Sequence, residues 1–249
     1  MAIELKDDNE VKSMEQSNRI VAVILKELEG IVKPGVSTAD IDRFVDSRIS
    51  EMGAIPAFKG YKGYPSAACV SVNEEIVHGI PGKRVLKSGD IVSVDIGTYC
   101  NNFYGDGCVT YCVGKVDEDT AKLVEATKEA LYAGIDRCRK GNRLGQVSRA
   151  IYDVAAKNRL GVVRAFVGHG IGRKLHEDPQ VSNYVGPWSE FILEKGLVIA
   201  LEPMFTLGDY RVSILRDGWT AVTRDRSFAA HFEHTIAVTD GEAKILTLS

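Results

Sequence analysis

The first part of the chain alternates apolar and polar positions with the period of an α-helix. Two apolar stripes result, and a break at Pro34-Gly35 separates them. Ser37 and Asp40 form a capping box, which predicts that the second helix begins there. The stripes consist of Met14, Val21, Ile24, Leu25, Leu28 and Val32, and of Ile41, Val45, Ile49 and Met52.

Strand-like segments follow the two helices. The segment ACVSVNEEIVHGIP (68–81) is short, rich in β-branched residues and closed by Gly-Ile-Pro. The segment DIVSVDIGTYCNNFYGDGCVTYCVG (90–114) is rich in Val, Ile, Tyr and Thr, with turn residues Asn101-Asn102 near its middle. It therefore predicts two antiparallel strands.

The same order of elements then begins again. Two further helical stripes over 123–138 and 144–154, separated by Lys140-Gly141, precede the strand-like segments 161–168, 197–205, 218–225 and 232–238. The segments VKPGVSTADI (32–41) and CRKGNRLGQV (138–147) occupy equivalent places, although their identity is slight. We therefore expect one α+β domain over residues 1–249, with pseudo-repeat halves of about 8–115 and 118–249.

Composition narrows the class of protein. The chain has 249 residues, 45% of them hydrophobic and 26% charged, with a net charge of -3. Basic and acidic residues are mixed throughout, which argues against a nucleic-acid or membrane surface. The polar N-terminal stretch lacks the apolar core of a secretion signal, and the five cysteines suggest reduced thiols. These features predict a soluble, cytoplasmic protein.

Carboxylates within apolar segments are the first candidates for chemistry. Asp95, Glu202 and Glu233 interrupt strand-like runs, and Asp106 follows in YGDGCV. Such a group is costly unless it is paired or bound to a metal. Any one of them is more often a salt-bridged or strand-end acid, but four together weaken that interpretation. A hairpin turning near Asn101-Asn102 would place Asp95 and Asp106 opposite each other.

Several carboxylates and few histidines describe an oxygen-rich site. Such a site favours a divalent ion such as Mn, Fe, Co, Zn or Mg over a thiolate zinc centre. Four carboxylates around one divalent ion leave excess negative charge, whereas two ions bring the site to neutrality and can hold a hydroxide between them.

Two of the five histidines lie in VGHGIGRKLHEDP (167–179), seven positions apart. In a helix, His169 and His176 would be about 10.5 Å apart along the axis, too far for one ion. In an ideal strand they would face opposite sides. We therefore expect the two histidines to have different roles, one as a metal ligand and the other facing a substrate. The alternative is that both are ordinary loop histidines. His231 is expected at the surface. His234, next to Glu233 in the sequence, is a candidate to support the site by contacting one of its residues.

The ordered set Asp95, Asp106, His169, Glu202 and Glu233 resembles the dinuclear metal site of the type I methionine aminopeptidases. The motifs SVNEEIVHGIP, VDIGTYCNNFYGDG, GHGIGRKLHEDP, ALEPMF and DGWTAVTRDRSFAAHFEHTI are similar to those of this family along nearly the whole chain. The resemblance implies the pita-bread (creatinase/aminopeptidase) fold, with two pseudo-symmetric halves around a mostly antiparallel curved sheet. It also implies a metallo-exopeptidase, a hydrolase that removes the initiator methionine before a small second residue.

The resemblance also implies a role for each residue. Asp95 would bind one of two divalent ions (Mn, Fe, Co or Zn), and His169 with Glu202 the other, while Asp106 and Glu233 bridge both. Glu202 would accept a proton from the attacking water that bridges the ions. His176 would donate to the carbonyl oxygen of the substrate, and His78 would contact the scissile amide.

The methionine pocket resembles one formed by Tyr61, Tyr64, Cys69 and Trp219, whose narrow aromatic shape suits a thioether. Aromatic and cysteine residues are also common core filler. The chain departs from the better-known bacterial pattern in three places, because Phe58 replaces a common cysteine, Lys62 a frequent histidine and Leu175 an expected phenylalanine. These departures put fine substrate selectivity and inhibitor preference in doubt, and not the reaction.

Partners and rivals follow from the same resemblance. We expect nascent polypeptide N-termini as substrates, contact with the ribosome, a monomeric state, and no specific nucleic-acid or membrane partner. Prolidase and aminopeptidase P share the implied fold but are typically longer, and a type II methionine aminopeptidase would carry a long insertion between His176 and Glu202. A non-catalytic binding module would have lost ligands, whereas all five positions are filled here.

Overall fold

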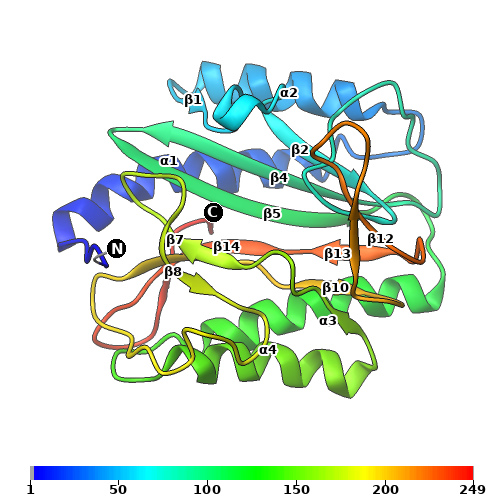
Figure 1. Cartoon of the computed structure of the whole chain (residues 1–249). Coiled ribbons are helices and arrows are strands. Elements are labelled where there is room, and N and C mark those ends of the chain that lie inside the picture. Colours follow the sequence, from blue (N-terminus) through cyan, green and yellow to red (C-terminus); the bar gives the residue numbers. More distant parts are fainter. Residues whose placement is uncertain (1–2, 249) are drawn as a thin grey trace.

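The structure is a computed structural model that describes residues 3–248. Four α-helices lie in two pairs along the chain, and strands follow each pair (Figure 1). The helices are α1 (Asp8–Leu28), α2 (Thr38–Glu51), α3 (Glu118–Ile135) and α4 (Leu144–Asn158). None of the helices in residues 3–248 has both the length and the apolar character needed to cross a membrane.

Local sequence sets where these helices begin and end. Ser37 caps α2, since its side chain accepts from the Asp40 backbone N–H while the Asp40 side chain accepts from Ser37 N–H, which confirms the predicted capping box. Helix α1 ends at Leu28, earlier than the predicted break at Pro34-Gly35. Gly30 follows almost at once, and glycine has a low helix propensity.

Every strand pairing in the described part of the chain is antiparallel, which confirms the expected α+β class and mostly antiparallel sheet. The main sheet has the order β1-β4-β5-β14-β9-β7-β8, with β2 beside β4 and β15 beside β14. Its strands are β1 (Ile55–Pro56), β2 (Ala68–Val72), β4 (Ile91–Cys100), β5 (Phe103–Cys112), β7 (Gly168–Gly170), β8 (Glu177–Val181), β9 (Val198–Leu201), β14 (Glu233–Ala237) and β15 (Lys244–Ile245).

Two three-stranded sheets and one short helix complete the fold. Their orders are β13-β10-β6 and β11-β12-β3. These elements are β3 (Glu75–Val77), β6 (Gly161–Val162), β10 (Met204–Thr206), β11 (Val212–Ile214), β12 (Ala221–Thr223), β13 (Ala229–His231) and the 3-10 helix η1 (Tyr61–Gly63). The predicted strand over 68–81 is thus two strands, because Asn73 adopts a positive φ between them.

The core consists mainly of two apolar clusters, one for each helix pair. One cluster joins α1 and α2 to β2 and β4, and the other joins α3 and α4 to β9 and β14. Figure 1 shows the first helix pair along the upper strands and the second pair below them. The central strands β5 and β14 pair with each other, so they bring the two parts of the chain together in one sheet.

The start of α2 and the start of α4 are alike. Gly35 and Gly141 both have φ near +90°, and the N-cap residues Ser37 and Arg143 each form an isolated antiparallel bridge, with Val85 and Ile192. The predicted boundary between residues 115 and 118 stays a prediction. The equivalence of the two halves stays a prediction.

Candidate active site and metal centre

The β4–β5 hairpin positions two carboxylates side by side. Asn101 and Asn102 make the predicted turn, both with positive φ, as a two-residue hairpin turn requires. Asp95 pairs with Cys108 and Asp106 pairs with Gly97, so the two aspartates are diagonal neighbours. The expectation that they lie directly opposite each other was wrong. Both still point to the same face, since their positions across the hairpin differ by two residues.

The other two carboxylates come from the second part of the chain. Glu233 begins β14 and pairs with Cys108 on β5, which places it beside the aspartates. Glu202 directly follows β9, and its backbone carbonyl accepts a hydrogen bond from Asn183 Nδ2 at 3.0 Å. The expected strand over 197–205 is broken there because Pro203 has no N–H for a sheet hydrogen bond.

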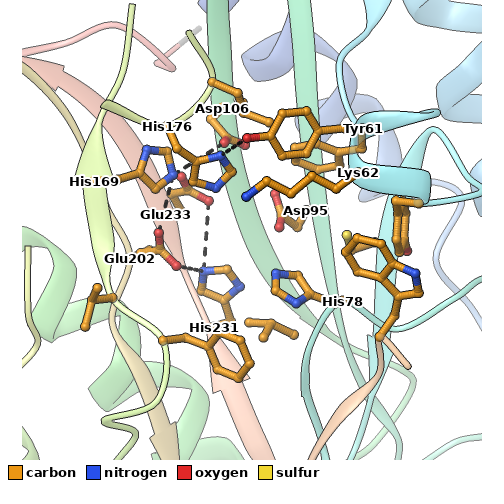
Figure 2. Close-up of a pocket in the computed structure, with 18 of the residues that line it drawn as sticks. Tyr61, Lys62, His78, Asp95, Asp106, His169, His176, Glu202, His231 and Glu233 are labelled. Carbon is orange, nitrogen blue, oxygen red and sulfur yellow. Dashed lines mark hydrogen bonds and ion pairs between the residues drawn. The ribbon is translucent and has the colours of Figure 1, made fainter. Parts of the chain in front are cut away.

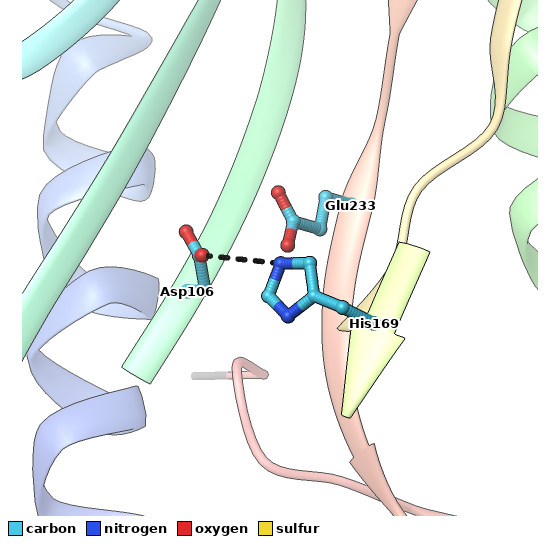
Figure 3. Close-up of side chains that lie close together, drawn as sticks. All are labelled: Asp106, His169 and Glu233. Atoms are coloured by element: carbon cyan, nitrogen blue, oxygen red, sulfur yellow. Dashed lines mark ion pairs between the residues drawn. The ribbon is translucent and has the colours of Figure 1, made fainter. Parts of the chain in front are cut away.

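His169 completes this group from the middle of β7. Its Nδ1 lies 2.9 Å from the Gly170 carbonyl oxygen, which can only accept, so Nδ1 carries the proton. Nε2 therefore presents a lone pair, 3.7 Å from Glu202 Oε1 and 3.9 Å from Asp106 Oδ2. Figure 3 shows His169 facing Asp106 and Glu233, and ligand atoms of these three residues lie within 4.8 Å of one another.

These residues fit divalent metal ions, judged by the unsatisfied atoms they present. Asp95 Oδ1, Asp106 Oδ1 and Glu233 Oε1 are buried without a hydrogen-bond partner. Within residues 3–248, the ion-pair contacts of the four carboxylates are with histidines and with no lysine or arginine. A buried carboxylate without a cation is strongly unfavourable, and divalent ions supply the missing positive charge.

The pKa values show the same unbalanced charge. Burial, followed by the charges of Glu233 and Asp95, raises the pKa of Asp106 well above its usual range. Burial also raises the pKa of Asp95 to about 7, and burial with the neighbouring carboxylates raises those of Glu202 and Glu233. Burial lowers the pKa of His169 to about 4, so this imidazole is neutral and able to bind a metal.

We expect the metal-free protein to lose stability as the pH rises from 6.5 to 8. The carboxylates hold protons in the folded state that the unfolded chain has already released, so folding becomes less favourable as the pH rises through their folded pKa values. All five histidines have lowered pKa values and act in the opposite direction, most strongly below about pH 6.5, where more than half of the unfolded histidines are protonated.

Thermal unfolding in chelator at pH 6.5 and pH 8 measures this effect. The melting temperature should fall by about 4 °C or more. The same scan with saturating Mn is the control, and it should show no such fall because the metal replaces the protons. A melting temperature that rises with pH in chelator would contradict the proposed burial of unpaired carboxylates.

The two histidines of the 167–179 segment meet because β7 and β8 form a hairpin. His176 immediately precedes β8, and its ring lies 4.3 Å from that of His169, centroid to centroid. The glycines permit this close packing, since a Cβ at Gly168 would lie 2.4 Å from the Ala200 carbonyl oxygen and one at Gly170 2.2 Å from that of Asp178. The spacing of the two histidines was considered for a helix and for a straight strand. The segment 167–179 is neither, because it folds back on itself as a hairpin.

Contacts outside the hairpin fix its position. Tyr61 OH lies 2.9 Å from His176 Nδ1, and the two rings stack at 5.4 Å. The next residue, Glu177, forms an ion pair with Lys6, and both side chains are buried. Glu177 also accepts a hydrogen bond from the Lys174 backbone N–H. The N-terminal segment therefore anchors the hairpin that carries both histidines.

All of the predicted site residues line one cavity of about 300 Å³ (Figure 2). They are Tyr61, Tyr64, Cys69, His78, Asp95, Asp106, His169, His176, Glu202, Trp219 and Glu233. The roles assigned to them individually stay predictions.

Aromatic contacts shape the wall of this cavity. Tyr64 and Trp219 pack edge to face at 5.2 Å, and Tyr64 OH donates to the Gly79 carbonyl at 2.8 Å. Cys69 on β2 pairs with Asp95, so the predicted pocket directly adjoins the carboxylates. His78 has a φ of +60°, an unusual conformation for a histidine, and its ring packs on Phe166 at 5.1 Å.

The three departures from the bacterial pattern also lie on this wall. The Phe58 ring covers Gly97 so closely that a Cβ there would lie 2.4 Å from it. Leu175 is buried in the same apolar cluster as Phe58 and Tyr61. Lys62 is exposed, with its Nζ 5.2 Å from the centre of the Tyr61 ring. The differences therefore change the surface that a ligand would contact.

Two expectations about histidines were wrong. His231, expected at the surface, is 2% exposed, and its Nε2 lies 3.8 Å from Glu202 Oε2 and 3.9 Å from Glu233 Oε2. His234 points away from the site and contacts Tyr132 OH and Thr247 Oγ1, because adjacent residues in a strand face opposite sides. The spacing of two between His231 and Glu233 was the signal available in the sequence.

Comparison with known proteins agrees with this geometry. Residues 12–240 match the model of metallopeptidase family M24. Methionine aminopeptidase 1 of Bacillus subtilis is 48% identical over 242 residues, which cover 97% of this chain and 98% of the relative. The crystal structure of methionine aminopeptidase from Thermotoga maritima superposes with a TM-score of 0.97 at 46% identity, covering 100% of both chains.

A structure of the rival class is more distant. The Xaa-Pro dipeptidase from Bacillus anthracis superposes with a TM-score of 0.79 at 20% identity, covering 98% of this chain but 62% of that chain, and so shares the fold alone. The pita-bread fold predicted from the sequence is confirmed. The chain carries carboxylates that fit divalent metal ions and is similar to methionine aminopeptidases over its full length. These findings show that it belongs to metallopeptidase family M24 and is one of the methionine aminopeptidases of that family.

Proposed function

We propose that the protein removes the initiator methionine from nascent polypeptides, preferring a small second residue, with the aid of two divalent ions. The observation that carries this proposal is a single cavity that has unsatisfied carboxylate oxygens on one side and an aromatic pocket on the other. A narrow pocket beside the metal centre suits the side chain of an N-terminal methionine. The α-amino group of that residue would bind at the charged end of the cavity.

The four carboxylates and His169 are the proposed metal ligands. Asp95 would hold one ion, His169 and Glu202 the other, and Asp106 and Glu233 both. Two divalent ions balance the four negative charges. When bound, they would lower the pKa of a water molecule towards neutrality and polarise the scissile carbonyl.

The remaining polar side chains manage protons and position the substrate. Glu202 would accept the proton of the attacking water, and its side chain lines the cavity. Tyr61 OH donates to His176 Nδ1 in the arrangement we propose, which leaves the proton on Nε2 for donation to the carbonyl oxygen. His78, packed against Phe166, would contact the scissile amide.

Methionine release from a Met-Ala-Ser peptide tests the proposed function. Protein supplemented with Mn, Co or Fe should release methionine, and chelator-treated protein should not. Hydrolysis of X-Pro dipeptides in place of Met-Ala peptides across a metal titration would favour a prolidase activity instead.

Contact with the ribosome and a monomeric state stay predictions. Sedimentation with ribosomes would check the first, and light scattering would check the second.

A further inference from the structure

His231 presents a polar atom that the proposed mechanism does not use. Its Nε2 is the single histidine nitrogen in residues 3–248 that is buried and without a hydrogen-bond partner. Nε2 faces Glu202 and Glu233, at 3.8 and 3.9 Å from their Oε2 atoms. In Figure 2 the ring lies at the base of the cavity, with its other nitrogen towards His78.

The backbone of His231 is fixed by a side chain from β5. The His231 N–H donates to Thr110 Oγ1 at 2.9 Å, and this hydroxyl donates to the His231 carbonyl at 2.7 Å. Since the Thr110 proton is committed, Ser93 Oγ must donate to Thr110 across 2.8 Å. His231 also pairs with Met204 in the β13–β10 ladder. These contacts therefore fix the backbone position from which the ring enters the cavity.

Glu202 divides its two oxygens between two histidines. Oε1 lies 3.7 Å from His169 Nε2, and Oε2 lies 3.8 Å from His231 Nε2. The gap at His231 exceeds a direct hydrogen bond by less than about 1 Å, and the terminal torsion of a glutamate is soft enough to close it. With metal bound, the carboxylates would be ionised and could only accept hydrogen bonds, so the ring nitrogen that faces them must be a donor in that state.

We propose that His231 is a positioning residue that donates an Nε2–H hydrogen bond to Glu202, with Glu233 as its second acceptor. This bond fixes the Glu202 carboxylate so that Oε1 stays directed towards His169 and the metal side of the cavity. His169 and His231 then hold opposite tautomers: His169 carries its proton on Nδ1 and presents Nε2 to metal, whereas His231 carries its proton on Nε2. The inference rests on the proposed role of Glu202.

Nitrogen NMR of the imidazole rings tests the tautomer without any turnover. In Zn-loaded protein, whose carboxylates are ionised, the His231 signals should show a protonated Nε2 and an unprotonated Nδ1. The signals are assigned as those lost in His231→Gln. Protonation on Nδ1, or coordination of Zn through Nε2, would overturn the proposal.

Two substitutions separate a hydrogen-bond donor from a packing role. His231→Leu removes the donor and should lower kcat about 10- to 100-fold, the usual cost of losing a partner that orients a ligand, with two metal equivalents still bound. His231→Gln keeps an N–H donor and should restore kcat to within about threefold of wild type. Equal damage in both variants, unchanged kcat in His231→Leu, or loss of a metal equivalent in His231→Gln would each overturn the proposal.

His234→Leu and His234→Gln are the matched controls. His234 is a buried histidine three residues away that contacts Tyr132 and Thr247 outside the cavity. Neither control should show the difference between Leu and Gln in kcat; such a difference would mean that the His231 result does not report on Glu202. If metal-loaded wild type releases no methionine, the proposed function fails, while the tautomer and metal stoichiometry still decide whether His231 is a donor.

Discussion

Replacing Asp106 with asparagine should abolish methionine release and at the same time stabilise the metal-free protein. Asparagine has nearly the same shape as aspartate but no charge. Asp106 is 4% exposed, and burial together with Glu233 and Asp95 disfavours its ionised form. Without metal, the Asp106 carboxyl must take up a proton as the chain folds, and asparagine avoids that cost, so the variant should melt above metal-free wild type by about 2–4 °C for each kcal/mol gained.

The same substitution removes a proposed ligand of both metal ions. Turnover should fall by more than about a hundredfold, because even the outer partners of metal ligands cost 10- to 100-fold when lost. The gain in melting temperature that wild type shows on metal addition should largely disappear, since stabilisation by a ligand depends on its affinity for the folded state.

Differential scanning fluorimetry with and without metal, together with peptide hydrolysis, measures both effects. Asp119→Asn is the matched control, because Asp119 is exposed on α3 and distant from the cavity. It should change neither quantity. A metal-free Asp106→Asn variant that melts below wild type would show that the carboxylate cluster is not under the strain that its burial implies.

His176→Ala should lower turnover about 100- to 1000-fold while both metals remain bound, whereas His169→Ala should lose metal. The two rings are neighbours but have different partners. His169 Nδ1 is held by the Gly170 carbonyl, so its Nε2 is free to serve as the proposed ligand. His176 Nδ1 faces Tyr61 OH, and its Nε2 is the proposed donor to the oxygen on which negative charge develops. Loss of one such donor typically has this cost.

Calorimetric titration with Mn and single-peptide kinetics separate the two roles. Tyr61→Phe is an informative control, because it keeps the His176 ring but removes the hydroxyl that sets its tautomer. It should lower kcat less than His176→Ala and leave metal stoichiometry unchanged. Equal loss of metal in the two histidine variants would contradict this division.

Local sequence determined much of this protein. Apolar periodicity predicted the helices, the Ser37–Asp40 capping box placed the start of α2, and Asn101-Asn102 placed the turn that brings Asp95 and Asp106 to one face. These features depend on neighbouring residues alone, so they can be read from the chain. The motifs identified the family, and all of the residues they indicated line one cavity.

Long-range packing decided what local pattern could not. Glu202 lies at a break between β9 and β10 rather than inside a strand, and His169 meets His176 only because β7 and β8 form a hairpin with a shifted register. His231 looked like a surface residue because its short segment has no clear alternation, yet the pairing of β13 with β10 buries it. Burial and strand partners depend on residues far apart in the sequence, and so the tertiary structure alone placed this histidine against Glu202 and Glu233.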